Sequence, residues 1–159
     1  MNPFTTDKHE AFRNKIREFA EQEVRPEARK LDQEERFSPE LTQKMAAQGL
    51  FGVAIPRQYG GQGLDYMALV LAVEEMARID GSQAATITAV NSLGIGPIYN
   101  YGTEEQRQRF LSPITREGRT WAFGLTERDA GSDSGSTRTH AELIDGQWHI
   151  NGSKMFISN

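Results

Sequence analysis

Two dipeptides near the end of the chain, Asp145-Gly146 and Asn151-Gly152, restrict the fold more than any other feature of the sequence. Each separates short runs rich in aromatic, aliphatic and β-branched residues. This arrangement is the strongest local signal for a β-hairpin with a two-residue turn. The pattern therefore predicts three antiparallel strands within residues 137–158.

The length of the turns also predicts how these strands pair, because a shift of one residue would move every side chain to the opposite face. The expected pairs are Ile144 with Gln147, Leu143 with Trp148, Ala141 with Ile150, and Trp148 with Met155. One face is apolar and is the expected core face: Ala141, Leu143, Trp148, Ile150, Met155 and Ile157. The other face is mainly polar: Arg138, His140, Glu142, His149, Lys154, Phe156 and Ser158. Phe156 is the exception, an aromatic ring on the polar face.

Up to Gly118 the sequence has a helical period, with apolar residues every three to four positions and caps between the runs. The first run consists of Phe12, Ile16, Phe19 and Val24, behind a capping box expected from Asp7 and Glu10. Further helix starts are expected at Ser38, Asp65, Ser82 and Thr103, and helix ends at Gly49 and Pro113.

Two of these helices carry specific packing predictions. The helix after Asp65 is expected to bury one stripe: Leu69, Val70, Val73 and Ala77. Residues 83–95 are apolar or small nearly all round, so we expect them in the middle of the bundle. Residues 120–126 form a strand candidate. The expected fold class is mainly α: an all-helical bundle domain, residues 1–118, followed by the first antiparallel strands of a β-barrel-like domain, residues 119–159.

Composition excludes several kinds of site. The chain has a formal net charge of −4 and contains no cysteine. It therefore has no disulfides or thiolate ligands, and its charge argues against a nucleic-acid-binding surface and an anionic membrane surface. No signal peptide or membrane-spanning run is recognisable, so a cytoplasmic location is expected.

Titratable groups suggest no metal site. His140 and His149 share the polar face, but a cross-strand pair of Glu142 with His149 is favoured over a metal site. His9 and the acidic pairs of the helical part are expected to be solvated: Glu74, Glu75, Glu104 and Glu105.

The loop 123–139 is dense in Gly, Ser and Thr. Such a loop can present backbone N–H groups and hydroxyls to a phosphate or to the polar edge of a ring, or it can be a solvated connector between strands. It contains neither the GxxxxGK[ST] phosphate loop nor the GxGxxG dinucleotide motif. Composition alone leaves both readings open.

Two segments, "FGLTERDAGSDSGSTRTHAEL" and "DGQWHINGSKMFISN", resemble the signature segments of the acyl-CoA dehydrogenase family. "IPRQYGGQGLD" and "YGTEEQRQRFL" are similar to that family's helical domain. The resemblance implies an N-terminal helical domain, a middle β-domain and a C-terminal helical bundle. It also implies non-covalent FAD, a homotetramer, an acyl-CoA substrate dehydrogenated between its α and β carbons, and an electron-transferring flavoprotein as partner.

The resemblance also implies site residues. Phe123, Leu125 and Thr126 would line the isoalloxazine ring, with Thr126 bonded to its pyrimidine side. Phe156 would pack against the flavin, and the Ser158 hydroxyl would reach toward flavin N5. Ser132 would contact the CoA part of the substrate, and Leu93 and Tyr99 are expected near the acyl pocket.

The sequence departs from the family pattern in several places. Arg128-Asp129 replaces a common Pro-Gly, and phenylalanine stands at positions 123 and 156, where the family often has Tyr and Trp. No residue matches the catalytic carboxylate, which the family carries in its C-terminal bundle, so the chain alone is expected to be inactive. The alternatives are an acyl-carrier-protein dehydrogenase, a flavin monooxygenase, or a non-catalytic binding or assembly module.

Overall fold

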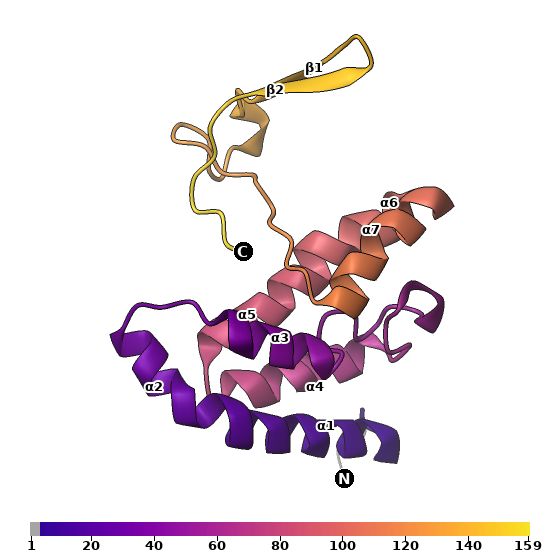
Figure 1. Cartoon of the computed structure of the whole chain (residues 1–159), viewed down its shortest axis with the longest axis vertical. Coiled ribbons are helices and arrows are strands. Elements are labelled where there is room, and N and C mark those ends of the chain that lie inside the picture. Colours follow the sequence, from indigo (N-terminus) through magenta and orange to yellow (C-terminus); the bar gives the residue numbers. More distant parts are fainter. Residues whose placement is uncertain (1–3) are drawn as a thin grey trace. The chain divides into compact units, whose positions relative to one another are not determined.

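The computed structural model describes residues 4–159 and divides the chain into two compact units (Figure 1). The first unit ends at Trp121 and is helical, and the second comprises residues 122–159. Each unit is described separately below. The predicted fold class, mainly helical and followed by antiparallel strands, is confirmed.

Between residues 4 and 121, the structure contains seven α-helices. They are α1 (Asp7–Phe19), α2 (Arg25–Gln33), α3 (Pro39–Ala47), α4 (Tyr66–Ala77), α5 (Gly81–Ala89), α6 (Gly96–Tyr101) and α7 (Glu104–Glu117). The π-helical segment η1 (Ala20–Val24) joins α1 to α2, and a second one, η3 (Val90–Ile95), joins α5 to α6. A short 3₁₀ turn, η2 (Arg57–Tyr59), lies in the loop before α4.

The buried residues confirm the predicted apolar face of α1 and η1, but they differ from the face predicted for α4. Phe12, Ile16, Phe19 and Val24 are all buried, as predicted. In α4, Leu69 and Val73 are partly buried against the core, but Val70 is 59% exposed and Ala77 is exposed, so the predicted stripe is wrong at these two positions. The buried residues of α4 are Ala68, Leu71, Ala72, Glu75 and Met76. Because this helix is apolar around most of its circumference, its own period does not select the buried face, and contacts with α1 and α5 do.

Several helix ends lie where the sequence places them. The Ser38 hydroxyl accepts from the Leu41 amide, and the Asp65 carboxylate accepts from the Ala68 amide at 2.9 Å. Thr103 and Gln106 form the predicted capping box of α7. These signals are local, which is why the sequence carries them.

Three other helix ends differ from the prediction. Thr6 and His9 form the capping box of α1, in place of Asp7 and Glu10, and Asp80 caps α5 in place of Ser82. Helix α7 continues past Pro113 to Glu117, before a left-handed residue, Gly118. Its last turn is held by tertiary contacts, since Thr115 is buried and its hydroxyl donates to the Tyr59 carbonyl at 2.7 Å.

The prediction that Glu75 is solvated is wrong. Its side chain is 1% exposed and accepts hydrogen bonds from guanidinium groups on α1 and at the end of α4. Arg13 Nε donates at 3.0 Å, Arg17 Nη2 at 2.8 Å and Arg78 Nη1 at 2.8 Å. Hydrogen bonds from Arg17, and then from Arg78, lower the pKa of Glu75 to about 2 against the opposing effect of burial. The buried charge is therefore compensated on both oxygens.

His9 is also not simply solvated. Its Nε2 lies 2.9 Å from Asp65 Oδ2, so it links the start of α1 to the start of α4. Asn91, in η3, makes a second polar link inside the unit. Its amide nitrogen donates to the carbonyls of Leu50 and Ile87 at 2.7 and 2.8 Å, and its oxygen accepts from the Val53 amide at 3.3 Å. These bonds fix the buried segment 50–53 against the long α5–η3–α6 rod.

The second unit contains β1 (His140–Ile144) and β2 (Gln147–Asn151), which pair antiparallel in the predicted register. The pairs Leu143–Trp148 and Glu142–His149 are both confirmed. Asp145 and Gly146 both have positive φ, 50° and 78°, as a type I′ turn requires.

The third predicted strand does not form. After Gly152 the chain leaves the hairpin, and the Met155 amide donates to the Thr126 carbonyl at 2.8 Å, so the predicted pair Trp148–Met155 is wrong. Residues 120–126 are not a strand either. The expected core face is exposed, with Trp148 67% accessible, because this two-stranded ribbon has no second layer within the described part of its unit.

Within residues 4–159, the helices are all too short or too polar to cross a lipid bilayer.

Candidate functional site

Two segments far apart in sequence meet in the second unit, residues 123–127 and the tail 152–158. We call their meeting point the loop–tail junction. The Met155 amide donates to the Thr126 carbonyl at 2.8 Å. The Lys154 ammonium donates to the Leu125 carbonyl and to Glu127 Oε1, both at 2.9 Å. The tail is therefore attached to the loop at three successive residues, 125, 126 and 127.

Glu127 is the centre of this junction. Besides Lys154, its carboxylate accepts from the backbone amides of Arg138 at 2.7 Å and Thr139 at 2.9 Å. Its side chain is 10% exposed. Hydrogen bonding from Thr139, then from the Arg138 amide and Lys154, holds the pKa of Glu127 far below its ordinary value. The carboxylate is thus a fixed anion that orders the backbone around it.

Gly152 allows the tail to turn back toward this junction. Its φ is +155°, and a Cβ at this position would lie 2.1 Å from Thr139 Oγ1 and 2.7 Å from Thr139 Cα. A side chain cannot be placed that close to another residue. The second turn of the sequence therefore serves a close backbone approach, and the third strand that it was expected to start is absent.

The flavin contacts implied by the resemblance, Phe123, Leu125, Thr126, Phe156 and Ser158, lie along the two segments of the junction. Phe123, Leu125 and Phe156 are exposed, and Thr126 is partly buried beside Met155. Phe156 is 86% exposed and has φ +57°, a left-handed conformation that is unusual for a bulky residue. Phe156 is therefore more exposed than Met155 because of this backbone turn and not because of strand alternation.

The two implied hydroxyl residues are also exposed. Ser158 lies two residues beyond Phe156 in the tail, and Ser132 lies in the loop just before a 3₁₀ turn, η4 (Ser134–Ser136). A planar heteroaromatic ring needs apolar surface to stack on and hydrogen-bonding groups at its rim. Phe123, Leu125 and Phe156 are residues of the first kind, and Thr126 and Ser158 are residues of the second kind.

Sequence reasoning missed the two residues that hold the junction together. In the sequence, Glu127 is one residue of the signature segment 123–143 and Lys154 is one member of the predicted polar face. One signal points to Lys154, which is the only charge in the segment 151–159; Glu127 stands beside Arg128 and Asp129, so its sequence context does not single it out. The ion pair between them cannot be predicted from the sequence, because the two residues are 27 positions apart and meet only where the tail folds back onto the loop.

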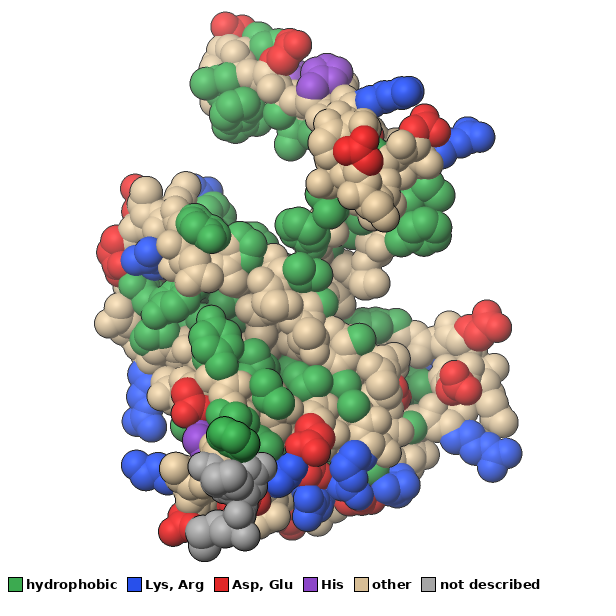
Figure 2. Space-filling model, turned by 180° about the vertical axis from the view of Figure 1, so that it is seen from behind, with side chains coloured by type: hydrophobic (Ala, Val, Ile, Leu, Met, Phe, Trp, Pro, Cys, Tyr) green, Lys and Arg blue, Asp and Glu red, His purple; other side chains and the backbone are tan. Residues whose placement is uncertain are grey.

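In the helical unit, a shallow apolar groove runs along α5 and η3, with a volume of about 540 Å³. Its lining is almost entirely small or aliphatic: Val73, Gly81, Ala84, Ala85, Thr88, Ala89, Ser92 and Leu93. Figure 2 shows apolar side chains at the surface of the molecule between charged ones. Leu93 borders the groove, whereas Tyr99 packs edge-on against the Tyr59 ring with a centroid distance of 6.1 Å.

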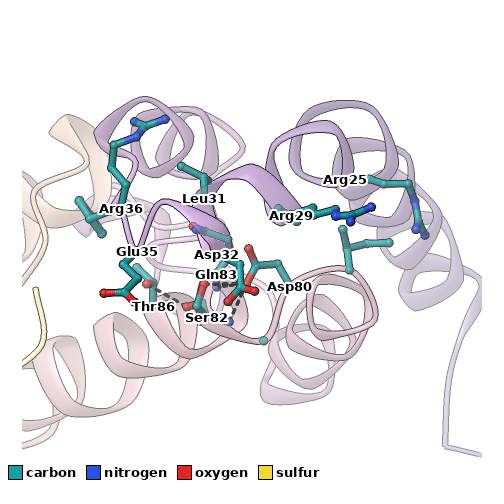
Figure 3. Close-up of a pocket in the computed structure, with 14 residues that line it drawn as sticks. Arg25, Arg29, Leu31, Asp32, Glu35, Arg36, Asp80, Ser82, Gln83 and Thr86 are labelled. Carbon is teal, nitrogen blue, oxygen red and sulfur yellow. Dashed lines mark hydrogen bonds between the residues drawn. The ribbon is translucent and has the colours of Figure 1, made fainter.

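A second cavity of the helical unit, of about 880 Å³, lies between α2, the segment after it and the start of α5 (Figure 3). Arg25, Arg29 and Arg36 face it, together with Asp32 and Asp80. The Asp80 carboxylate is engaged as the cap of α5, accepting from the Ser82 amide at 2.8 Å. This cavity contains none of the residues implied by the resemblance.

Within the described residues, no cluster of three or more His, Asp or Glu side chains is arranged to hold a metal ion. His149 lies opposite Glu142, and His140 lies opposite Asn151.

Comparisons with known proteins agree on one family. Residues 6–118 match the family described as "Acyl-CoA dehydrogenase, N-terminal domain". The short-chain-specific acyl-CoA dehydrogenase of Clostridium acetobutylicum is 42% identical over 154 residues, covering 97% of this chain and 41% of that protein. The 3-(aryl)acrylate reductase of Clostridium sporogenes is 41% identical over 155 residues, covering 98% of this chain and 41% of that protein.

A solved structure from the same family is also similar to this chain. The acyl-CoA dehydrogenase of Bacillus anthracis, complexed with FAD, is 30% identical, with a TM-score of 0.89, over 100% of this chain and 28% of that chain. The chain thus spans 41% of the length of the two curated relatives.

Proposed function

The chain belongs to the acyl-CoA dehydrogenase family, and from this membership we propose that it forms the N-terminal part of an FAD-dependent oxidoreductase. The complete enzyme would dehydrogenate an acyl-CoA thioester between its α and β carbons, in lipid metabolism. Residues 1–118 would form the helical domain and residues 119–159 the start of the β-domain. The loop–tail junction carries this proposal, because it brings the two signature segments together.

FAD, when bound, supplies a two-electron acceptor for the hydride from the substrate. We assign its contacts to Phe123, Leu125 and Phe156 as stacking surfaces, and to Thr126 and Ser158 as hydrogen-bonding groups. Their exposure on the two joined segments supports the assignment. The FAD in the related structure from Bacillus anthracis supports the identity of the cofactor.

We assign the CoA part of the substrate to Ser132, and one wall of the acyl site to the groove that Leu93 borders. The exposed position of Ser132 and the apolar lining of the groove support these two assignments. The name of the relative from Clostridium acetobutylicum makes a short acyl chain the first substrate to test.

Further proposals concern the complete protein. It would be cytoplasmic and homotetrameric and pass electrons to an electron-transferring flavoprotein. The 159 residues alone would not turn over, because none of them matches the catalytic carboxylate of the family. Glu127 does not replace it, since its oxygens are engaged by Arg138, Thr139 and Lys154.

A second candidate is the reverse reaction, reduction of an α,β-unsaturated substrate. It is favoured by the 3-(aryl)acrylate reductase, which is nearly as similar as the dehydrogenase. Both reactions involve the same carbon–carbon bond and the same residues of this chain, so direction is the property to measure.

Anaerobic flavin spectroscopy tests both candidates. The complete protein is loaded with FAD and mixed with butyryl-CoA. If it is a dehydrogenase, the absorbance of the oxidised flavin is expected to fall after mixing. Reoxidation of chemically reduced flavin by an arylacrylate or its CoA ester, with no bleaching by saturated acyl-CoA, would favour the reductase. A protein that binds no FAD would refute both candidates, and turnover by the 159-residue chain would refute its predicted inactivity.

A further inference from the structure

Glu127 accepts hydrogen bonds from three donors in two other segments of the sequence. The Arg138 and Thr139 amides come from the segment leading into β1, and the Lys154 ammonium comes from the tail after β2. One carboxylate therefore joins the loop, the entry to the hairpin and the exit from it. Charge-assisted bonds of this kind are among the stronger ones in proteins.

Lys154 extends this link to the segment expected to face the flavin. Its ammonium donates to the Leu125 carbonyl at 2.9 Å as well as to Glu127. The next residue, Met155, donates its amide to the Thr126 carbonyl. Residues 154 and 155 are thereby held against residues 125 and 126.

Among the proposed apolar flavin contacts, Phe156 has the least packing to hold it. Phe156 is 86% exposed, and Phe123 and Leu125 are exposed as well. Side chains without packing partners take their position from the backbone that carries them. The spacing between Leu125 and Phe156 is therefore set by the bonds just before Phe156, those of Lys154 and Met155.

We propose that Glu127 and Lys154 are a positioning pair for the flavin, which hold the segment 123–126 and the tail 155–158 at the spacing that the isoalloxazine ring requires. Neither residue touches the ring, and neither takes part in the reaction. This inference rests on the proposed FAD site and adds to it the two side chains that set its geometry.

The pair is tested in the complete protein with Glu127→Gln and Lys154→Met. Glutamine keeps the shape of the carboxylate but offers only one acceptor oxygen, and methionine keeps the apolar stem of lysine without its charge. Each variant is expected to weaken FAD binding by about tenfold or more, the factor that corresponds to one charge-assisted hydrogen bond. Lys154→Arg, which keeps the cation, is expected to restore most of the affinity.

Two readouts separate positioning from general loss of structure. The absorption and fluorescence of the bound flavin are expected to shift toward those of free flavin in both variants, whereas far-UV circular dichroism of the helices stays unchanged. Asp129→Asn is the matched control, because Asp129 lies in the same loop and makes only an exposed ion pair with Arg138, at 3.5 Å. It is expected to change FAD affinity less than about twofold.

FAD affinity and spectra equal to those of the unsubstituted protein in both variants would overturn the pairing role and leave the proposed function standing. If Glu127→Gln fails to fold, Lys154→Met still decides the question, since it leaves the carboxylate and its two backbone donors in place. An unsubstituted protein that binds no FAD would refute the proposed function, and the positioning role would fall with it.

Discussion

Replacement of Glu75 by glutamine tests the most unexpected feature of the helical unit. Glutamine is the neutral isostere of the carboxylate, so it removes the charge without leaving a cavity. It also turns an N–H group toward guanidinium groups that are themselves only donors. Of the side chains bonded to Glu75, those of Arg17 and Arg78 are nearly half exposed and that of Arg13 less so.

The size of the effect follows from the pKa of Glu75. A fall from the ordinary value of 4.5 to about 2 corresponds to about 3 kcal/mol of extra stability for the charged form. Because the arginines can regain water when the partner is lost, we expect Glu75→Gln to lower the free energy of unfolding by about 2–3 kcal/mol at pH 7. That is a large fraction of the stability of an ordinary domain.

The pH dependence has a definite sign. The pKa of Glu75 is lower in the folded state, so its contribution is present above the unfolded value near 4.5 and is lost as pH falls toward about 2. Urea unfolding followed by far-UV circular dichroism is measured for both proteins from pH 7 down to pH 3.5. The difference between them is expected to be constant from pH 7 to about pH 5.5 and to shrink below that.

Glu74→Gln is the matched control, since Glu74 is the preceding residue, is half exposed and bonds to Arg13 as well. It is expected to change the unfolding free energy little. Equal losses from the two substitutions, or a loss for Glu75→Gln that stays the same down to pH 3.5, would refute the buried-charge explanation.

Three further substitutions test other parts of the structure. Asn91→Leu leaves the Leu50 carbonyl and the Val53 amide buried without their partner, so urea unfolding is expected to show a loss of about 2–4 kcal/mol; a loss near zero would contradict the role given to Asn91. Gly152→Ala forces a methyl group into Thr139 and is expected to destabilise the second unit by about 1–3 kcal/mol, measured by amide hydrogen exchange in β1 and β2. Gly131→Ala is its control, because a Cβ there meets no atom within 4 Å. Phe156→Ala is expected to leave the unfolding free energy within about 0.5 kcal/mol, since the ring is exposed, while FAD affinity in the complete protein falls; unchanged affinity would contradict the stacking role.

The sequence predicted those parts of the fold that local chemistry determines. Caps such as Ser38 and Asp65 bond within four residues, and the Asp145-Gly146 turn fixes its own register, so all three are found as expected. The burial of Glu75 depends on arginines 58 and 62 residues away, which no local pattern reveals. Helix α7 passes Pro113 for a similar reason, because Thr115 bonds to Tyr59.

The candidate site divides in the same way. Its apolar and hydroxyl residues could be taken from the signature segments, but their geometry could not. The third strand is predicted from the Asn151-Gly152 turn and the alternation after it, but the tail leaves β2 at Gly152 and bonds instead to the backbone carbonyls of Leu125 and Thr126. The ion pair between Glu127 and Lys154 forms because the tail folds back onto the loop.

The π-helical segment η3 has a consequence for how the chain tolerates changes in length. A π turn carries one residue more than an α turn, so deleting one residue from Val90–Ile95 would bring α6 into α-helical phase with α5, with Pro97 then lying inside the joined helix. Each residue of an α-helix turns the chain by roughly 100°, so α6 and its Tyr99 would swing about the rod by that angle relative to α5. A deletion at Val90 would also turn Asn91 away from the three backbone groups to which it bonds. A one-residue deletion in η3 is therefore expected to be tolerated less well than one in an exposed loop.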